Sequence, residues 1–562
     1  MRFAPLLLLC TMLPLAASEK PNPLPAHYFQ LMEQGLARVD QRLASESSPT
    51  LASLESQDGW KHFPSAMLAA AVLYTRRHAD NKHRGDPKML ALALKIGDLC
   101  AREQEAGTYD TRLDHDRDTY MWLETYRLLD RELGDDRRER WRRLLVALIT
   151  EIAADTAKRQ DYPLYQSPFI GTSPNHMSVW AGTVYIAGKV FGNQEWQRLA
   201  AKVLHRFAAE EQSPDGYWGE HSSAGPTTGY DYLTSAAVAE YYEHSHDSAA
   251  FEALHRSTEF HEYFTYPDGM PVETINDRNR YWEVPVWGLF GFSNFADGRR
   301  YARFLTDHYE HFSLESLGRI AQDALYYHEG RELPIPQDRE RYAHRMNVPA
   351  GIRKSGPWVV CLSGIIATQA PTSQFYLDRQ SNLSVFREGS GLVITGANSK
   401  RQPELAMIAE EIGGQTYFMP MSSRLDMTDR EDRLALSYNT FFTELTVPPP
   451  TDQRLAFSVA VTPRGHMAKA QLTLQLVLHP GEALETAGRT VTLDDQPLSL
   501  DVPDSIRHHG WTLKLDQPAH LTWPVRPFNP YSNAPEKGIN HAVGALVTDL
   551  DGQPQTLHFA IE

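Results

Sequence analysis

The spacing of apolar residues changes once along this chain of 562 residues, and the change limits the folds that the chain can adopt. From about Pro25 to about Glu329 the apolar residues recur every three or four positions, which predicts amphipathic helices. After Trp358 they alternate with polar residues, as in the segment 472–478, which predicts β-strands. The sequence therefore predicts an α+β multidomain protein, with a helical domain followed by an antiparallel β-sandwich.

The helical region contains about a dozen predicted helices, separated by short polar or Gly/Pro-rich breaks. The segments 141–152 and 196–207 show the clearest apolar faces. Successive helices of this kind form stacked hairpins, arranged either as a closed toroid or as an open solenoid. The sequence signatures of the familiar helical-repeat families do not occur in the chain.

A charged, proline-rich stretch separates the two regions and ends the helical pattern. We therefore predict a helical domain over 19–335, a linker over 336–357 and a sandwich over 358–562. Within the sandwich, residues 388–390 are expected to turn a hairpin, and Asp551-Gly552 to join two terminal strands.

Residues 1–18 have the layout of a secretory signal peptide. Arg2 precedes an apolar run from Leu6 to Leu15, and small residues follow at 16–18. The run is too short to span a bilayer, and the alternative is a buried N-terminal helix. We expect cleavage near Ser18 and export to the periplasm or the medium.

The net charge of −16 argues against nucleic acid as a partner. No stretch after the predicted leader is apolar enough to predict membrane insertion.

After the predicted leader only Cys100 and Cys361 remain, in different predicted domains, so two free thiols are expected. No organic cofactor and no active-site metal is predicted, because neither paired-cysteine zinc patterns nor phosphate-binding glycine loops occur, whereas a structural metal ion is left open. The oligomeric state is left open. Five histidines are expected to be solvated or at the core edge: His205, His244, His246, His255 and His261.

Unusual residues are concentrated between Tyr162 and Trp282, in the breaks between predicted helices. Loops on a rigid scaffold are where binding and catalytic sites are commonly built. The first break contains Asn175 and His176 just before an apolar helix, where Pro174 fits the first helical position. These two side chains are expected either to act in catalysis or to make first-turn hydrogen bonds.

Two further breaks combine glycine and proline with aromatic and titratable residues. The second break, 213–232, holds Trp218, Glu220, His221, Tyr230 and Tyr232; Tyr232 is expected to pack in the core and Asp215-Gly216 to form a turn. The third break follows Tyr266-Pro267-Asp268-Gly269 and contributes Arg278, Arg280, Tyr281 and Trp282, although arginine pairs are most often solvated.

These features together resemble the heparinase II/III-like, alginate and glucuronan lyases, which have an (α/α) toroid. The resemblance rests on an Asn-His break, two Pro-Asp-Gly breaks, a following tyrosine and a terminal β-sandwich. It implies cleavage of an acidic polysaccharide by β-elimination. In such families an Asn or His neutralises the uronate carboxylate, a Tyr or His removes the C5 proton, and a Tyr protonates the leaving oxygen.

The resemblance gives each candidate residue a role. The C5 proton becomes acidic only when hydrogen bonds neutralise the neighbouring carboxylate. We expect Asn175 and His176 to provide this neutralisation, with Glu220 as a protonated helper and His221 helping to hold the uronate. A tyrosine needs nearby positive charge to act as a base, which Arg278 and Arg280 supply next to Tyr281. Tyr281 and Tyr230 are base and acid in an order that the sequence leaves open. Sugar rings are expected to stack on Trp218 and Tyr165, whereas Trp122 is expected in the core.

Two other functions remain open at this stage. A glycoside hydrolase on the same toroid would use two carboxylates, such as Glu220 with Asp231 or Asp277. A non-catalytic glycan-binding protein would use Trp218 and the arginines only to hold the polymer. The polymer's uronate and the mode of cleavage are not specified by the sequence.

Overall fold

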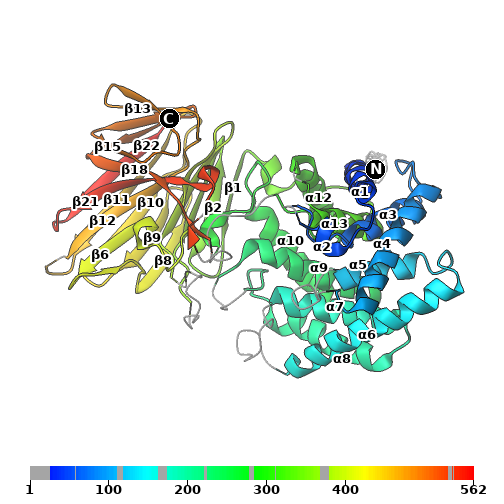
Figure 1. Ribbon diagram of the computed structural model, residues 1–562. Coiled ribbons are helices and arrows are strands. Elements are labelled where there is room, and N and C mark those ends of the chain that lie inside the picture. Colours follow the sequence, from blue (N-terminus) through cyan, green and yellow to red (C-terminus); the bar gives the residue numbers. More distant parts are fainter. Residues whose placement is uncertain are drawn as a thin grey trace, which may run out of the picture.

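The computed structural model describes residues 26–56, 59–109, 118–161, 174–219, 225–276, 284–310, 312–367, 377, 379–466, 468–529, 534–535 and 537–562. The predicted signal peptide, 1–18, lies outside these residues. None of the helices in the described part of the chain combines the length and the apolar character needed to cross a membrane. A helical domain and a β-sandwich lie side by side (Figure 1).

Helices of the N-terminal region alternate between an inner and an outer ring. Among the described residues the inner helices are α3 (Ser65–Thr75), α5 (Asp118–Leu128), α7 (Pro174–Val190), α9 (Thr228–Ser245), α11 (Leu289–Phe292) and α13 (Leu314–Tyr326). The outer helices are α1 (His27–Ala44), α4 (Pro87–Ala106), α6 (Asp135–Arg159), α8 (Gln194–Arg206), α10 (Ser248–Tyr263) and α12 (Ala296–His308). Shorter elements are α2 (Leu51–Leu54), η1 (Phe207–Glu211) and η2 (Glu273–Ile275).

Each inner helix packs against the next, and α13 packs against α3, so the ring closes. The burial pattern explains which helices lie inside. Residues 65–73 of α3 are all buried, as expected for a helix that is apolar on every side. In α1 the buried residues recur every three or four positions and form one face. The helical domain is therefore an (α/α) toroid, and the open solenoid that the sequence left possible does not form.

Charged residues lie inside the ring as well as apolar ones. Glu124 of α5 is fully buried, and its Oε2 accepts hydrogen bonds from Arg127 Nη2 at 2.7 Å and from the Tyr326 hydroxyl at 2.8 Å. Glu240 of α9 is also buried. Burial and the negative charge of Glu124 raise the pKa of Glu240 to about 8. The folded protein therefore holds a proton that the unfolded chain releases at lower pH.

This proton makes stability depend on pH. Because folding raises the pKa of Glu240, its proton contributes fully to the unfolding free energy below about pH 4.5. This contribution is lost progressively as the pH rises to about 8. We expect Glu240→Gln, which cannot titrate, to lose less unfolding free energy between about pH 6 and about pH 9 than the parent protein. Urea unfolding midpoints at both values measure this difference. Equal losses in the two proteins would contradict the assignment of the proton to Glu240.

The C-terminal region forms two antiparallel sheets that face each other. Among the described residues the first sheet has the order β1-β2-β3-β4-β5-β12-β21-β18-β15, with β6 and β7 beside β12. Its strands are β1 (Arg341–Arg345), β2 (Ala350–Ser355), β3 (Trp358–Ser363), β4 (Asn382–Arg387), β5 (Gly391–Thr395), β6 (Ile408–Ile412), β7 (Gln415–Tyr417), β12 (Lys469–Leu476), β15 (Leu498–Val502), β18 (Ala519–Val525) and β21 (Val543–Leu550).

The second sheet has the order β14-β13-β16-β17-β22-β11-β10-β9-β8. Its strands are β8 (Ser422–Met427), β9 (Asp432–Ser437), β10 (Phe441–Val447), β11 (Leu455–Pro463), β13 (Ala483–Thr486), β14 (Arg489–Thr492), β16 (Ser505–His508), β17 (Trp511–Leu515) and β22 (Gln555–Ile561). Alternate residues of β11 are buried between the sheets, which gives the period of two that the sequence shows. A short pair, β19 (Phe528–Asn529) with β20 (Ala534–Pro535), stands apart, and η3 (Pro336–Asp338), η4 (Pro403–Leu405) and η5 (Ile539–His541) are single turns.

The predicted linker requires a correction. Strands β1 and β2 lie within 336–357 and pair with each other and with β3, so the sandwich begins near Arg341 instead of at 358. Pro336 precedes β1, Pro349 lies in the turn between β1 and β2, and Pro357 lies in the turn between β2 and β3, so none of them interrupts the ladder. The hairpin predicted around 388–390 is confirmed by the pairing of β4 with β5.

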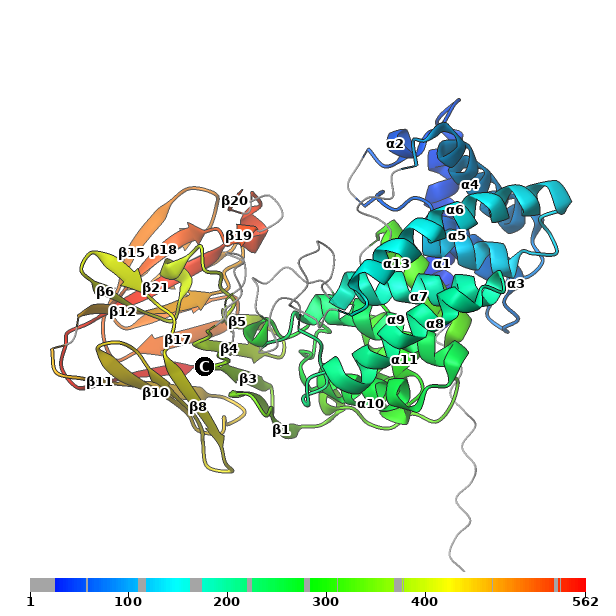
Figure 2. The same ribbon diagram turned by 90° about the horizontal axis from the view of Figure 1, so that it is seen from below.

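Polar side chains join the sandwich to the toroid at η2. The buried carboxylate of Glu273 accepts hydrogen bonds from the Tyr266 hydroxyl at 3.0 Å and from Thr395 Oγ1 at 2.8 Å. Asn382 Nδ2 donates to the carbonyl of Thr274 at 3.0 Å, and Gln380 Nε2 donates to that of Asn276 at 2.9 Å. Figure 2 shows β3, β4 and β5 on the side of the sandwich that faces the helices. These bonds fix the chain immediately before residue 277.

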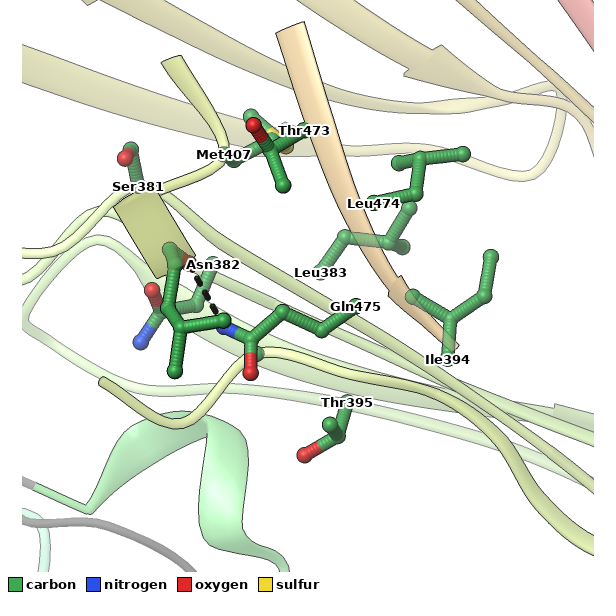
Figure 3. Close-up of a pocket in the computed structure, with 11 residues that line it drawn as sticks. Ser381, Asn382, Leu383, Ile394, Thr395, Met407, Thr473, Leu474 and Gln475 are labelled. Atoms are coloured by element: carbon green, nitrogen blue, oxygen red, sulfur yellow. Dashed lines mark hydrogen bonds between the residues drawn. The ribbon is translucent and has the colours of Figure 1, made fainter. Parts of the chain in front are cut away.

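A small pocket lies behind this junction, within the first sheet (Figure 3). Asn382, Thr395 and Met407 are among its lining residues. Gln475 also lines it, and its amide donates to the carbonyl of Leu405 at 2.6 Å. The side chains around the pocket are apolar, hydroxyl or amide groups, which supply neither an acid nor a base for catalysis. We regard the pocket as part of the packing of the sandwich.

Candidate active site

The N-terminal ends of two inner helices lie close to the sandwich. Gly225 precedes α9 by three residues, and a Cβ placed on it would lie 3.6 Å from Ile365 of the sandwich and 4.0 Å from the carbonyl oxygen of Ile275. Helix α7 packs along α9 inside the ring. Both helices begin in breaks that the sequence singled out, so Asn175, His176 and Tyr230 lie at the ends of the inner helices on the side of the sandwich.

Asn175 and His176 form the first turn of α7, which begins at Pro174 as the sequence predicts. The side chain of Asn175 is 4% exposed, and its Oδ1 accepts the backbone N–H of His176 at 2.9 Å. The ring of His176 is half-buried, 6.3 Å from that of Trp180. A helix N-terminus carries partial positive charge and favours an anion such as a carboxylate. First-turn hydrogen bonding and a role in binding an anion are thus compatible at Asn175.

Tyr230 is the third residue of α9 and is half-buried. The packing of α7 against α9 shows how far along the helix axis Tyr230 lies relative to Asn175. A Cβ placed on Gly182 of α7 would lie 3.8 Å from the Cβ of Ala237 of α9. Both inner helices run in the same direction, and Asn175 and Tyr230 precede these contact residues by the same length of about two turns. The two helices therefore hold Asn175 and Tyr230 at the same level of the toroid.

A buried Asp–His pair is formed by Asp231, the residue after Tyr230, and His261 of α10. Asp231 Oδ2 contacts His261 Nε2 at 2.8 Å, and Asp231 Oδ1 accepts the backbone N–H of Trp218 at 2.6 Å. Burial raises the pKa of Asp231, and the hydrogen bond to His261 opposes this shift. Asp231 thus ties the second break to α9 and α10 and positions the chain that leads to residue 220. Asp231 is buried and both of its carboxylate oxygens already have hydrogen-bond partners, so it does not suit the acid role considered for a hydrolase.

Trp218 is a core residue, which corrects its predicted role as a stacking surface for sugars. Its side chain is 1% exposed, and its indole N–H donates to the carbonyl of Phe207 at 2.9 Å. An aromatic ring must expose a face to stack on a sugar, and this ring exposes none. Trp122 and Tyr232 are buried, as expected from the sequence.

Both Pro-Asp-Gly motifs are turns, with positive φ angles of 93° at Gly216 and 85° at Gly269. A Cβ on Gly216 would lie 2.2 Å from the carbonyl oxygen of Arg256, so this position requires glycine for space as well as for backbone angle. Asp215 Oδ1 accepts hydrogen bonds from Asn347 N at 2.7 Å and Asn347 Nδ2 at 2.9 Å. Both motifs therefore have a structural role as turns, and the first also joins the helical domain to the β1–β2 turn of the sandwich.

Six predicted site residues fall outside the described residues: Tyr165, Glu220, His221, Arg278, Arg280 and Tyr281. Asp277 does so too. Two of these segments have described neighbours at this junction. Gly219 and Gly225 flank the segment of the second break, and Asn276 and Val284 flank that of the third break. Asn276 Nδ2 approaches Thr228 Oγ1 of α9 at 3.5 Å. Sequence reasoning missed the positioning roles of Asp231 with His261 and of Glu273, because no local pattern links residues so far apart in the chain.

Removing Asp231 should destabilise the protein strongly. Asp231→Ala leaves His261 and the Trp218 N–H buried without their partner, which should cost about 3–5 kcal/mol of unfolding free energy. Asp86→Ala is a matched control, since Asp86 contacts His83 Nδ1 at 2.9 Å near the surface. We expect that change to cost about 1 kcal/mol. Urea unfolding of both variants measures the difference, and similar costs would argue against a tightly held buried pair.

No protein-family model and no curated protein matches the sequence. Solved structures do match. Chondroitin AC lyase of Streptomyces coelicolor A3 in complex with chondroitin sulphate has a TM-score of 0.52 at 10% identity, over 97% of this chain and 80% of that chain. A mutant of the same lyase gives 0.51 at 9% identity over the same shares. A chondroitinase AC lyase studied in oligosaccharide complexes gives 0.50 at 9% identity, over 95% of this chain and 82% of that chain.

These matches span both domains and confirm the predicted order of toroid and sandwich. At this identity they concern the fold alone. The chain has the fold of polysaccharide lyases that combine a helical toroid with an antiparallel β-sandwich.

Proposed function

We propose that this protein is an exported lyase that cleaves a uronic-acid-containing polysaccharide by β-elimination. The observation that carries the proposal is the placement of Asn175 and Tyr230 at one level, at the N-terminal ends of adjacent inner helices. This arrangement offers an amide for a carboxylate and a phenol for proton transfer, on the fold of known polysaccharide lyases. The complex of one such lyase with chondroitin sulphate supports an acidic polysaccharide as the substrate class.

The reaction needs a charge stabiliser, a base and an acid. Asn175 and His176, at the positive end of α7, would hydrogen-bond the uronate carboxylate and stabilise the charge that develops on it. A base then removes the C5 proton, and that electron pair forms the C4–C5 double bond as the C4–O bond breaks. The leaving oxygen takes a proton from an acid. Tyr230 and Tyr281 would share the last two roles.

The remaining predicted residues would complete the site. Glu220 in its protonated form and His221 would help to hold the carboxylate. Arg278 and Arg280 would lower the pKa of a nearby tyrosine through their positive charge. Tyr165 would stack on a sugar ring. Asp231, Trp218 and Glu273 would act indirectly, since they anchor the segments that carry these residues.

The test is an activity panel on the purified mature protein. Alginate, glucuronan, hyaluronan, chondroitin and heparan polymers are each incubated with it, and both ultraviolet absorbance and reducing ends are followed. Elimination yields an unsaturated sugar, so absorbance should rise with one polymer class. New reducing ends without absorbance would identify a glycoside hydrolase instead. No change in either signal across the panel, with binding to a polymer retained, would replace the proposal with a non-catalytic glycan-binding role.

A further inference from the structure

Two histidines and one glutamate meet in the sandwich, outside the candidate active site. His479 and Glu482 lie in the connection between β12 and β13, and His509 lies in the turn between β16 and β17. One possible ligand atom from each of the three lies within 4.8 Å of the other two. Both oxygens of Glu482 approach His509 Nδ1, at 2.8 and 3.0 Å. The ring centroids of His479 and His509 are 4.0 Å apart.

The backbone holds the His479–Glu482 connection in place. Glu482 N–H donates to the carbonyl of His479 at 3.2 Å, which closes a turn with these two residues at its ends. Gly481 N–H donates to Leu493 O at 2.7 Å, and Leu493 N–H donates to Glu482 O at 2.9 Å. The Glu482 end of the turn is therefore anchored to the chain at Leu493.

The second segment is a two-residue hairpin turn. His509 and Gly510 both have positive φ, 42° and 77°, and the flanking residues His508 and Trp511 pair across the hairpin. Positive φ at a residue other than glycine is uncommon and carries some strain. A glycine or asparagine is the usual residue in such a turn. At this position the ring of His509 contacts Glu482.

His508 links the two segments without being a ligand. Its Nδ1 lies 2.9 Å from the carbonyl of Ala483, which requires a proton on Nδ1. Its Nε2 lies 2.9 Å from the backbone N of His479 and accepts that N–H. Both ring nitrogens are thus engaged with the backbone next to Glu482 and of His479. His508 thus fixes the backbone that carries His479 and Glu482.

The ligand set identifies the class of ion. Imidazole nitrogens favour zinc and related transition metals, whereas calcium and magnesium favour sites made entirely of oxygen. Two histidines and one glutamate are three of the four ligands of a tetrahedral zinc site, and water completes it. The side chains of His509 and Glu482 are 33% and 42% exposed, so an ion can reach them from solvent. Both free cysteines are buried and belong to other parts of the chain.

We propose that His479, Glu482 and His509 bind one divalent transition-metal ion of the zinc class, which ties two parts of the sandwich together. β12 belongs to the first sheet and β13 to the second, so the His479–Glu482 turn is a crossover between the sheets. An ion would fasten this crossover to the β16–β17 hairpin. Arg387 Nη1 donates to the carbonyl of Gly510 at 3.0 Å, and Arg387 ends the strand whose first residue, Asn382, contacts η2. The site thus lies away from the candidate active site and does not depend on the proposed function.

The proposal is tested by zinc binding to the full mature chain without a histidine tag, after treatment with a chelator. Isothermal titration calorimetry with zinc chloride should give one ion per chain. Glu482→Gln and His509→Ala should each weaken binding by more than about 100-fold, the upper range for loss of an outer-sphere partner. His520→Ala is the matched control, since His520 contacts Asp501 at 3.0 Å on the same domain but outside the cluster. It should bind zinc as the parent does.

A second measurement separates loss of the site from loss of the fold. Zinc should raise the melting temperature of the parent and of His520→Ala, and leave that of Glu482→Gln unchanged. Calcium should have no such effect. Absence of zinc binding to the parent, or undiminished binding to both cluster variants, would overturn the proposal. Neither result would bear on the elimination reaction, which the polymer panel tests separately.

Discussion

Replacing Tyr230 by phenylalanine should lower kcat for elimination by about 10²–10⁴-fold, the usual contribution of a positioned acid or base. The change removes one hydroxyl from a half-buried side chain at the N-terminal end of α9 and leaves the ring to pack. The proton that Tyr230 gives or takes in the transition state then has no carrier, whereas polymer binding needs only the surrounding groups. We therefore expect kcat to fall much more than KM rises, measured by ultraviolet absorbance with the polymer that responds in the panel.

Tyr241→Phe is the control for this change. Tyr241 lies near the other end of α9, and its hydroxyl donates to Asp247 Oδ2 at 2.9 Å. Its loss should cost about 1–3 kcal/mol of stability and leave kcat unchanged. If Tyr230→Phe and Tyr241→Phe retained equal activity, Tyr230 would have no part in proton transfer. Tyr281 would then have to supply both the base and the acid, or the chemistry would not be elimination.

Local patterns in the sequence predict the elements of this fold better than their boundaries. The period of apolar residues identifies the helices, and the turn at 388–390 identifies the β4–β5 hairpin. The sequence does not predict strands β1 and β2, because they are charged and flanked by prolines. Only one residue of β1 is buried, so no alternating apolar pattern is visible there. Asp551-Gly552 joins β21 to β22, which belong to different sheets, although a local turn signal alone suggests neighbouring strands.

The sequence likewise predicts the candidate site only in part. The break before α7 and the break before α9 are visible in the sequence, and helix packing brings Asn175 level with Tyr230. A tryptophan in a Gly/Pro-rich break suggests an exposed aromatic surface, yet Trp218 packs in the core, and Phe207 and Asp231 accept its indole and backbone N–H groups there. These partners lie on other elements, and a single sequence contains no sign of them.

The histidine cluster of the sandwich was hidden for a related reason. His479 and Glu482 are three positions apart, but His509 joins them only because β13 pairs with β16. Strand pairing over such separations follows from the whole sandwich and from no local motif. The sequence left a structural metal ion open, because the known ligand spacings are absent and this arrangement follows none of them.

Replacing Asn175 by aspartate should abolish most of the elimination activity, with a loss of at least about 10²–10³-fold in kcat/KM. Aspartate has nearly the same size and keeps an oxygen in the position that accepts the His176 N–H, so the first turn of α7 should remain intact. It has no N–H to donate to the uronate carboxylate, and it places a second negative charge beside that carboxylate. Both the lost hydrogen bond and the added negative charge would destabilise the transition state, in which negative charge develops on the uronate.

Asn193→Asp makes the same chemical change at a helix N-terminus away from the site. Asn193 caps the outer helix α8, where its Oδ1 accepts the N–H groups of Glu195 and Trp196. Aspartate serves equally well as a cap, so this variant should keep full activity and stability. If Asn175 had only a capping role, Asn175→Asp would behave in the same way, and the two variants would be equally active. A large loss confined to Asn175→Asp, with unchanged thermal unfolding, would place the carboxylate of the substrate at the positive end of α7.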